Sequence, residues 1–174
     1  AKQLSDYCIE HFYDHEYQFF SFTSNLDTPL IAKHFETEDN VIPSSNSVMA
    51  ANLFKLSIYF HNSHYEMIAY KMVAIILPTI DYPSAFSNWL NVFLNYSEQN
   101  KELAICGPDA LNYLAKINEK YLPNIIVAGS ESVSKIPFLE NRFVAAKNMF
   151  YVCQNKTCLA PTSSLEEIFK EISL

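Results

Sequence analysis

Glycine is scarce in this chain. Only Gly107 and Gly129 occur among 174 residues, where an average composition of about 7% would give roughly a dozen. Phosphate-binding loops of the G-x-G-x-x-G and G-x-x-x-x-G-K-[ST] types need several glycines, so the sequence excludes both. The 15 asparagines and the serines must then supply many of the turns that glycine usually forms.

Positive charge and long apolar runs are also lacking. The chain has 12 basic and 19 acidic residues, a formal net charge of -7, and no basic stripe that could follow a nucleic-acid backbone. No apolar run approaches the roughly 20 residues of a membrane-spanning helix. The first residues, AKQLSDYCIE, lack the basic-then-apolar order of a signal peptide. We therefore expect a soluble, cytoplasmic protein with no nucleic-acid or membrane partner.

Residues 1–98 show mainly helical periodicity. Apolar residues recur at helical spacing from Leu4 to Phe12, from Met49 to Phe60, from Tyr65 to Ile75 and from Phe86 to Leu94. Two short runs, YQFFSFT at 17–23 and LIAKHF at 30–35, flank the turn-rich SNLDTP and predict a β-hairpin. The sequence thus predicts paired helices with an inserted hairpin over 1–98.

Residues 99–174 have a different pattern. ELAIC (102–106) and NIIVAG (124–129) predict buried strands around a helix over 111–117, with Asp109 as its cap. MFYVC (149–153) and TCLAP (157–161) predict a tight hairpin, and a final helix follows with Ser163 or Ser164 as its cap. These elements predict a small α/β unit after the helical part.

A polar cluster, DNVIPSSNSV at 39–48, precedes the apolar helix that begins near Ser47. The cluster admits two interpretations. Serine and asparagine oxygens can accept hydrogen bonds from the unpaired N–H groups of a helix start, which gives a cap without chemistry. The same N–H groups and side chains can instead face a ligand.

The same segment resembles a known family. DNVIPSSNSV is similar to the D-N-A-x-P-S-G-N-S-V segment of the spermatogenesis-associated protein 20 (YyaL) family. Three more stretches match that family in order: EYQFFSFT, YLPNIIVAG and YVCQNKTCLAP. The resemblance covers nearly the whole chain but only the C-terminal portion of a family member. Members of the family join a thioredoxin-like domain to a ring of helical hairpins.

The resemblance implies that 1–98 are the closing helices of an α/α toroid of the six-hairpin glycosidase-like kind. Asp39 would then be a candidate acid or base at the edge of a central pocket. The resemblance makes three further polar residues candidate partners for the hydroxyls of a sugar-like ligand, with two aromatic residues as a stacking surface: Ser44, Asn46, Ser47, Phe20 and Trp89. No cofactor is implied. Ser45 stands where the family has glycine, so a positive φ there would be strained.

Cys153 and Cys158 form a C-x4-C pair. Facing residues of a hairpin have Cβ atoms about 4.5–5.5 Å apart, so a disulfide can form between them. Zinc would need further ligands. We favour two buried thiols over a disulfide, and a disulfide over zinc, because a chain without a secretory signal more often keeps its thiols free. The five histidines are interpreted as surface or capping residues, and no metal site is expected.

Two functions follow from the sequence. One is a carbohydrate-active or redox-linked protein of which this chain forms part of a sugar-like pocket. The other is a non-catalytic structural or interaction module that supports the absent thioredoxin-like domain. In either case the missing N-terminal part is the expected partner. The uncovered helical flank, which includes Leu4, Ile9 and Phe12, predicts self-association.

Overall fold

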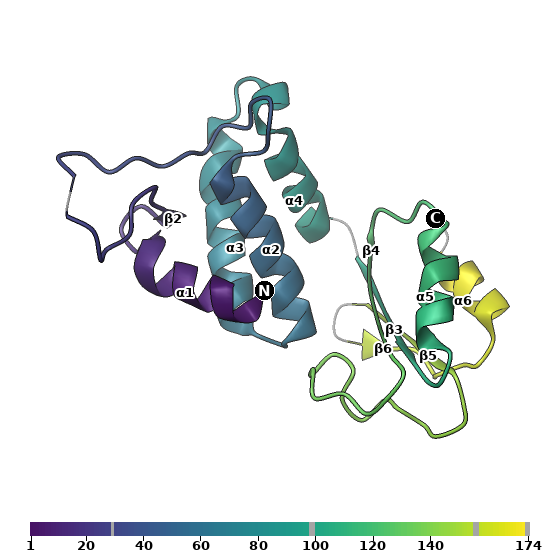
Figure 1. The fold of residues 1–174 in the computed structure, drawn as a ribbon. Helices are drawn as coiled ribbons and strands as arrows, with labels where there is room; N and C mark the ends of the chain where they lie inside the picture. Colours follow the sequence, from purple (N-terminus) through teal and green to yellow (C-terminus); the bar gives the residue numbers. More distant parts are fainter. Residues whose placement is uncertain (29, 98–99, 155–156, 173–174) are drawn as a thin grey trace. The chain divides into compact units, whose positions relative to one another are not determined.

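The computed structural model describes residues 1–28, 30–97, 100–154 and 157–172 (Figure 1). The fold is a mixture of α-helix and β-sheet. Two compact units make it up, one of residues 1–58 and 62–94, the other of residues 59–61 and 95–174. The sequence placed this division at 98/99. None of the described helices is long and apolar enough to cross a membrane.

The first unit contains the predicted helices. Helix α2 carries a mostly buried apolar face that includes Leu53 and Leu56, and the buried face of α3 includes Ile68 and Met72. Pro78 follows α3 and is the second residue of a short 3-10 helix over Leu77–Thr79. The helices span Lys2–Phe12 (α1), Ser45–Tyr59 (α2), Ser63–Ile76 (α3) and Ser87–Ser97 (α4).

The β-hairpin of this unit lies earlier in the chain than the sequence pattern predicted. Strand β1 (Tyr13–Asp14) pairs antiparallel with β2 (Phe19–Phe20). The turn forms here because Asp14 Oδ1 accepts from the N–H groups of Glu16 and Tyr17, at 2.8 and 3.0 Å, and Gln18 takes a positive φ. The predicted strand at 30–35 is wrong: the described residues of this stretch form no strand, although the Phe22 N–H donates to the His34 carbonyl at 3.0 Å.

The second unit is built on one sheet in the order β4-β3-β5-β6. Strands β3 and β4 are parallel, and the other pairs are antiparallel. This arrangement confirms the predicted strand–helix–strand followed by a hairpin. The elements are β3 (Lys101–Cys106), α5 (Ala110–Asn118), β4 (Ile125–Ser130), β5 (Met149–Gln154), β6 (Thr157–Cys158) and α6 (Leu165–Ile172).

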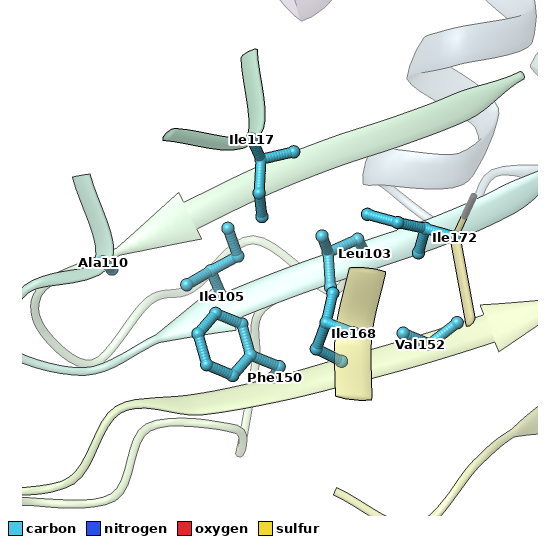
Figure 2. Close-up of a cluster of buried hydrophobic side chains, with 8 residues drawn as sticks. All are labelled: Leu103, Ile105, Ala110, Ile117, Phe150, Val152, Ile168 and Ile172. Atoms are coloured by element: carbon cyan, nitrogen blue, oxygen red, sulfur yellow. The ribbon is translucent and has the colours of Figure 1, made fainter. Parts of the chain in front are cut away.

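One face of this sheet packs against both helices (Figures 1 and 2). Alternate residues of β3 and β5 point to this face because side chains alternate along a strand. They meet Ile117 of α5 and Ile168 of α6 in one buried cluster. The strand residues in this cluster are Leu103, Ile105, Phe150 and Val152. Tyr151 and Cys153 alternate with these residues along β5, so their side chains lie on the opposite face of the sheet.

The caps of the two helices differ from one another. Ser164 Oγ accepts from the Glu167 N–H at 3.3 Å, as predicted for a serine cap. Asp109 makes no side-chain cap to α5. Its carboxylate accepts instead from the Asn148 side-chain amide at 2.9 Å, and its N–H donates to Asn148 Oδ1 at 2.9 Å. A partner 39 residues away thus replaces the predicted local cap.

Candidate functional site: a polar network at the start of helix α2

The four polar residues singled out by the sequence lie together at the start of α2. Asp39 is 5% exposed, and Ser44, Asn46 and Ser47 are also buried. Burying so many polar groups is unfavourable unless each finds a hydrogen-bond partner. The hydrogen bonds around them therefore decide what the cluster can do.

Asp39 caps two helices at once. Its Oδ1 accepts from the Ser44 N–H at 2.9 Å and from the Ser47 hydroxyl at 2.7 Å, both at the start of α2. Its Oδ2 accepts from the N–H of Asn88, in the first turn of α4, at 2.8 Å. A carboxylate is favourable at a helix start because the unpaired N–H groups there carry partial positive charge. Asp39 is fixed in place by groups from both helices.

The two serines complete the cap. Ser44 Oγ accepts from the Ser47 N–H at 3.2 Å, the expected N-cap geometry. The Ser44 hydroxyl lies 3.3 Å from the Thr37 carbonyl, to which it donates. Ser47 Oγ accepts from the Asn88 side-chain amide at 2.9 Å. The helix-cap interpretation of the cluster is confirmed.

Asn46 connects three segments of chain. Its Oδ1 accepts from the Phe20 N–H at 2.7 Å, and its Nδ2 donates to the carbonyls of Phe20 and Glu36, both at 3.0 Å. Phe20 lies at the end of β2, and Glu36 lies near the end of the segment that leads to α2. One side chain therefore ties the beginning and the end of this connecting segment to α2.

Ser45 does not need to be glycine. It is the first residue of α2 and is not among the described residues with positive φ. Its N–H donates to the Glu36 carboxylate at 2.9 Å. This bond, and a second one from the Ser45 hydroxyl, lower the pKa of Glu36. The strain expected from a serine at this position is therefore absent.

The two aromatic residues proposed as a stacking surface are core residues. Trp89 is 0% exposed, and its indole N–H donates to the Thr37 carbonyl at 2.7 Å. Phe20 is buried as well and packs against Tyr13, with ring centroids 5.1 Å apart. Neither ring has a free face for a ligand. Phe22, two residues further on, is exposed.

Sequence reasoning missed three members of the network: Glu36, Thr37 and Asn88. A usable signal did exist, because Ser87-Asn88 is a second polar pair at a helix start. Glu36 and Thr37 carry no such pattern, since they participate through a bond to Ser45 and through a backbone carbonyl.

The segment between β2 and α2 exposes many apolar side chains. In Figure 1 its dark blue trace extends away from α1 and α2 before it returns to the start of α2. The described part of 21–44 contains no helix or strand. Ile31 is fully exposed, and the other exposed apolar residues of the segment are Phe22, Leu26, Leu30, Val41 and Ile42. We call residues 22–42 the apolar segment.

In the second unit, Cys153 and Cys158 form a disulfide. They face each other across β5 and β6, which confirms the predicted strand pairing. The preferred interpretation as two free thiols is wrong, because the hairpin register brings the two sulfur atoms together. Among the described residues, no group of three or more His, Cys, Asp or Glu side chains could hold a metal ion.

Comparison with known proteins gives a distant relative. No family model matches the chain, and no solved structure matches it. The geometry alone therefore defines a helical unit with a buried polar cap, joined to a small α/β unit. The chain is similar to spermatogenesis-associated protein 20 of Rattus norvegicus, with 26% identity over 183 aligned positions. The alignment covers 98% of this chain and 23% of the relative's length.

Proposed function

We propose that this chain is a non-catalytic structural and docking module of a longer protein related to spermatogenesis-associated protein 20. In this proposal the helical unit is a rigid base that presents the apolar segment to another part of the protein. The exposed apolar side chains of 22–42 are the observation that carries the proposal. The helices α1 to α4 would belong to an α/α toroid in the whole protein.

The polar network supports a structural role over a catalytic one. Asp39 uses both carboxylate oxygens to accept three hydrogen bonds from protein groups. A general acid or base must instead reach a substrate proton, directly or through one water. The side-chain amide of Asn46 is likewise hydrogen-bonded to backbone groups of Phe20 and Glu36. A sugar-like ligand would have to compete with these bonds, so we do not favour a pocket at this position.

The apolar segment supports docking because such side chains are seldom left in water together. Burial of about 300 Å2 of apolar surface contributes roughly 7 kcal/mol before the cost of association is subtracted. Asn46 bonds Phe20, just before the segment, and Glu36, within it, to α2, which lowers the entropy lost when the segment binds. The network and the segment thus act together in this proposal.

The proposed partner is another part of the same longer polypeptide. The chain spans about a quarter of the relative that it matches, so a protein of the relative's length has ample chain to cover the apolar segment. Expressed alone, the chain would cover the segment with a second copy. We therefore propose that the isolated chain self-associates.

Sedimentation velocity at micromolar concentration tests this. We expect the unaltered chain to associate and the double variant Ile31→Ser/Ile42→Ser to sediment as a monomer. The matched control is Tyr121→Ser/Val133→Ser, which removes two exposed apolar side chains of the other unit and should associate like the unaltered chain. Binding of an apolar dye should fall only in the Ile31/Ile42 variant.

Two results would contradict the proposal. One is a compact monomer of the unaltered chain with no dye binding, and the other is equal association of all three proteins. A titration with simple sugars tests the competing function. A saturable rise in melting temperature that is lost in Asp39→Asn would favour the ligand pocket.

A further inference from the structure

The two sulfur atoms of the Cys153–Cys158 disulfide differ in their access to solvent. Cys153 is 2% exposed, whereas Cys158 on the short strand β6 is exposed. Thiol–disulfide exchange begins when a thiolate attacks one sulfur, and access decides which sulfur is attacked. An incoming thiol can therefore reach Cys158, and Cys153 would be the sulfur that leaves.

Among the residues that the structure describes, Arg142 is the cation that lies beside both sulfur atoms. Arg142 is the sole arginine of the sequence. Its Nη2 lies 3.5 Å from Cys153 Sγ and 3.8 Å from Cys158 Sγ. The guanidinium lies over the rings of Phe138 and Tyr151, with its central carbon 5.2 and 5.3 Å from the ring centroids.

The second terminal nitrogen of Arg142 is buried and has no hydrogen-bond partner among the described residues. A buried donor without a partner is costly, so such groups point to a function or to an absent partner. A thiolate at Cys153 would place a negative charge beside this guanidinium. The negative charge of Glu102, which faces Cys153 across β3 and β5, would work against a thiolate at this position. Arg142 is therefore a group that can stabilise a negatively charged sulfur here.

We propose that Cys153–Cys158 is a reversible thiol–disulfide exchange site, with Cys158 as the attacked sulfur and Arg142 as the residue that stabilises the departing Cys153 thiolate. The substrate class is an exposed thiol, either a small molecule or a cysteine of another protein. In the first step the thiolate of this substrate forms a bond to Cys158 Sγ. The bond between the two cysteines breaks, and its electron pair goes to Cys153 Sγ beside Arg142.

A second substrate thiolate completes the exchange. It attacks the substrate sulfur of the mixed disulfide, releases the oxidised substrate disulfide and leaves Cys158 as a thiolate, which takes a proton from water. Two substrate thiols are oxidised, and one protein disulfide is reduced to two cysteines. The other described cysteines, Cys8 and Cys106, are poor attacking thiols in this exchange. Burial raises the pKa of both thiols, so less of each is present as the reactive thiolate.

Reduction of the full chain by glutathione tests the proposal, with quenched samples digested and analysed by mass spectrometry. We expect glutathione to appear first on Cys158. Arg142→Met should slow reduction roughly three- to tenfold, because a leaving thiolate without its cation is more basic. Arg142→Lys keeps the charge and should restore most of the rate, which a merely structural role would not explain.

Lys147→Gln is the matched control, since it removes an exposed positive charge from the same loop. It should reduce at the rate of the unaltered chain. The proposal is overturned if the folded chain resists glutathione, if glutathione attaches to Cys153 first, or if Arg142→Met and Lys147→Gln reduce at equal rates. Circular dichroism checks that each variant is folded, and the attachment site on the unaltered chain requires no variant at all.

Discussion

The side-chain amide of Asn46 hydrogen-bonds both the N–H and the carbonyl of Phe20, a residue 26 positions earlier in the chain. The same amide holds the Glu36 carbonyl. The side chain thus substitutes for a neighbouring strand at the end of β2. The polar residues at the start of α2 fix the connecting segment as well as capping the helix.

Replacement of Asn46 by alanine should destabilise the first unit by about 2–4 kcal/mol, because the buried backbone groups of Phe20 and the carbonyl of Glu36 would lose their partner. Trp89 is the one tryptophan of the chain and is buried in this unit, so its fluorescence reports the unfolding. Asn40→Ala, at an exposed position nearby, is the control and should change the free energy of unfolding by less than about 0.5 kcal/mol. Equal effects of the two variants would refute the role of Asn46.

Replacement of Asp39 by asparagine should cost about 1–3 kcal/mol. The substitution preserves shape, but it removes the charge at two helix starts and turns one acceptor into a donor that faces an N–H group. Urea unfolding followed by Trp89 fluorescence measures the loss. The exposed Asp81 provides the comparison, and Asp81→Asn should be close to neutral. Unchanged stability in Asp39→Asn would mean that its carboxylate does not hold α2 and α4.

The two glycines should respond differently to alanine. Gly107 has a φ of +149°, and a Cβ there would lie within 2.6 Å of Asn148, so Gly107→Ala should destabilise the second unit by at least about 2 kcal/mol. Gly129 would place its Cβ at an ordinary 3.5 Å from the Ile105 carbonyl oxygen. Gly129→Ala should therefore be tolerated. Hydrogen exchange of the β3 amides distinguishes them, and equal protection in both variants would contradict the expectation.

Acid should weaken the attachment of α1 to α3. Lys2 Nζ donates to Asp6 at 2.7 Å and the Tyr65 hydroxyl donates to the same carboxylate, so the pKa of Asp6 lies below its ordinary 3.8. A lowered folded-state pKa stabilises the fold above the unfolded value, and this stability is lost as the pH falls through the folded value. The contribution is small, below about 1 kcal/mol, because the ion pair is about half exposed.

Asp6→Asn checks this pH dependence. The unaltered chain should lose more stability than the variant between about pH 5 and pH 2, since only the unaltered chain must protonate Asp6. Above pH 5 the difference between the two proteins should be constant. Thermal unfolding across this range measures both, and parallel curves at low pH would argue against the Asp6 contribution.

The sequence predicted those elements that depend on local pattern. Helices α2, α3 and α4 follow from apolar spacing with polar starts, and Asn62 caps α3 through bonds to the N–H groups of His64 and Tyr65. Strands β3, β4 and β5 follow from short apolar runs. The predicted hairpin between 17–23 and 30–35 does not form, because LIAKHF at 30–35 has the composition of a strand but makes no strand pairing.

For the polar cluster, the sequence by itself determined that a carboxylate, two serines and an asparagine would stand at the start of one helix. Only the tertiary structure decided what they hold. Asp39 meets Asn88 across 49 residues, and Asn46 meets Phe20 across 26. The same is true of Arg142, which reaches two sulfur atoms from a loop of no distinctive pattern. The local sequence pattern indicates which hydrogen bonds a residue can make to nearby backbone groups. The distant partners come together only when separate segments pack, because their buried polar groups must then be paired.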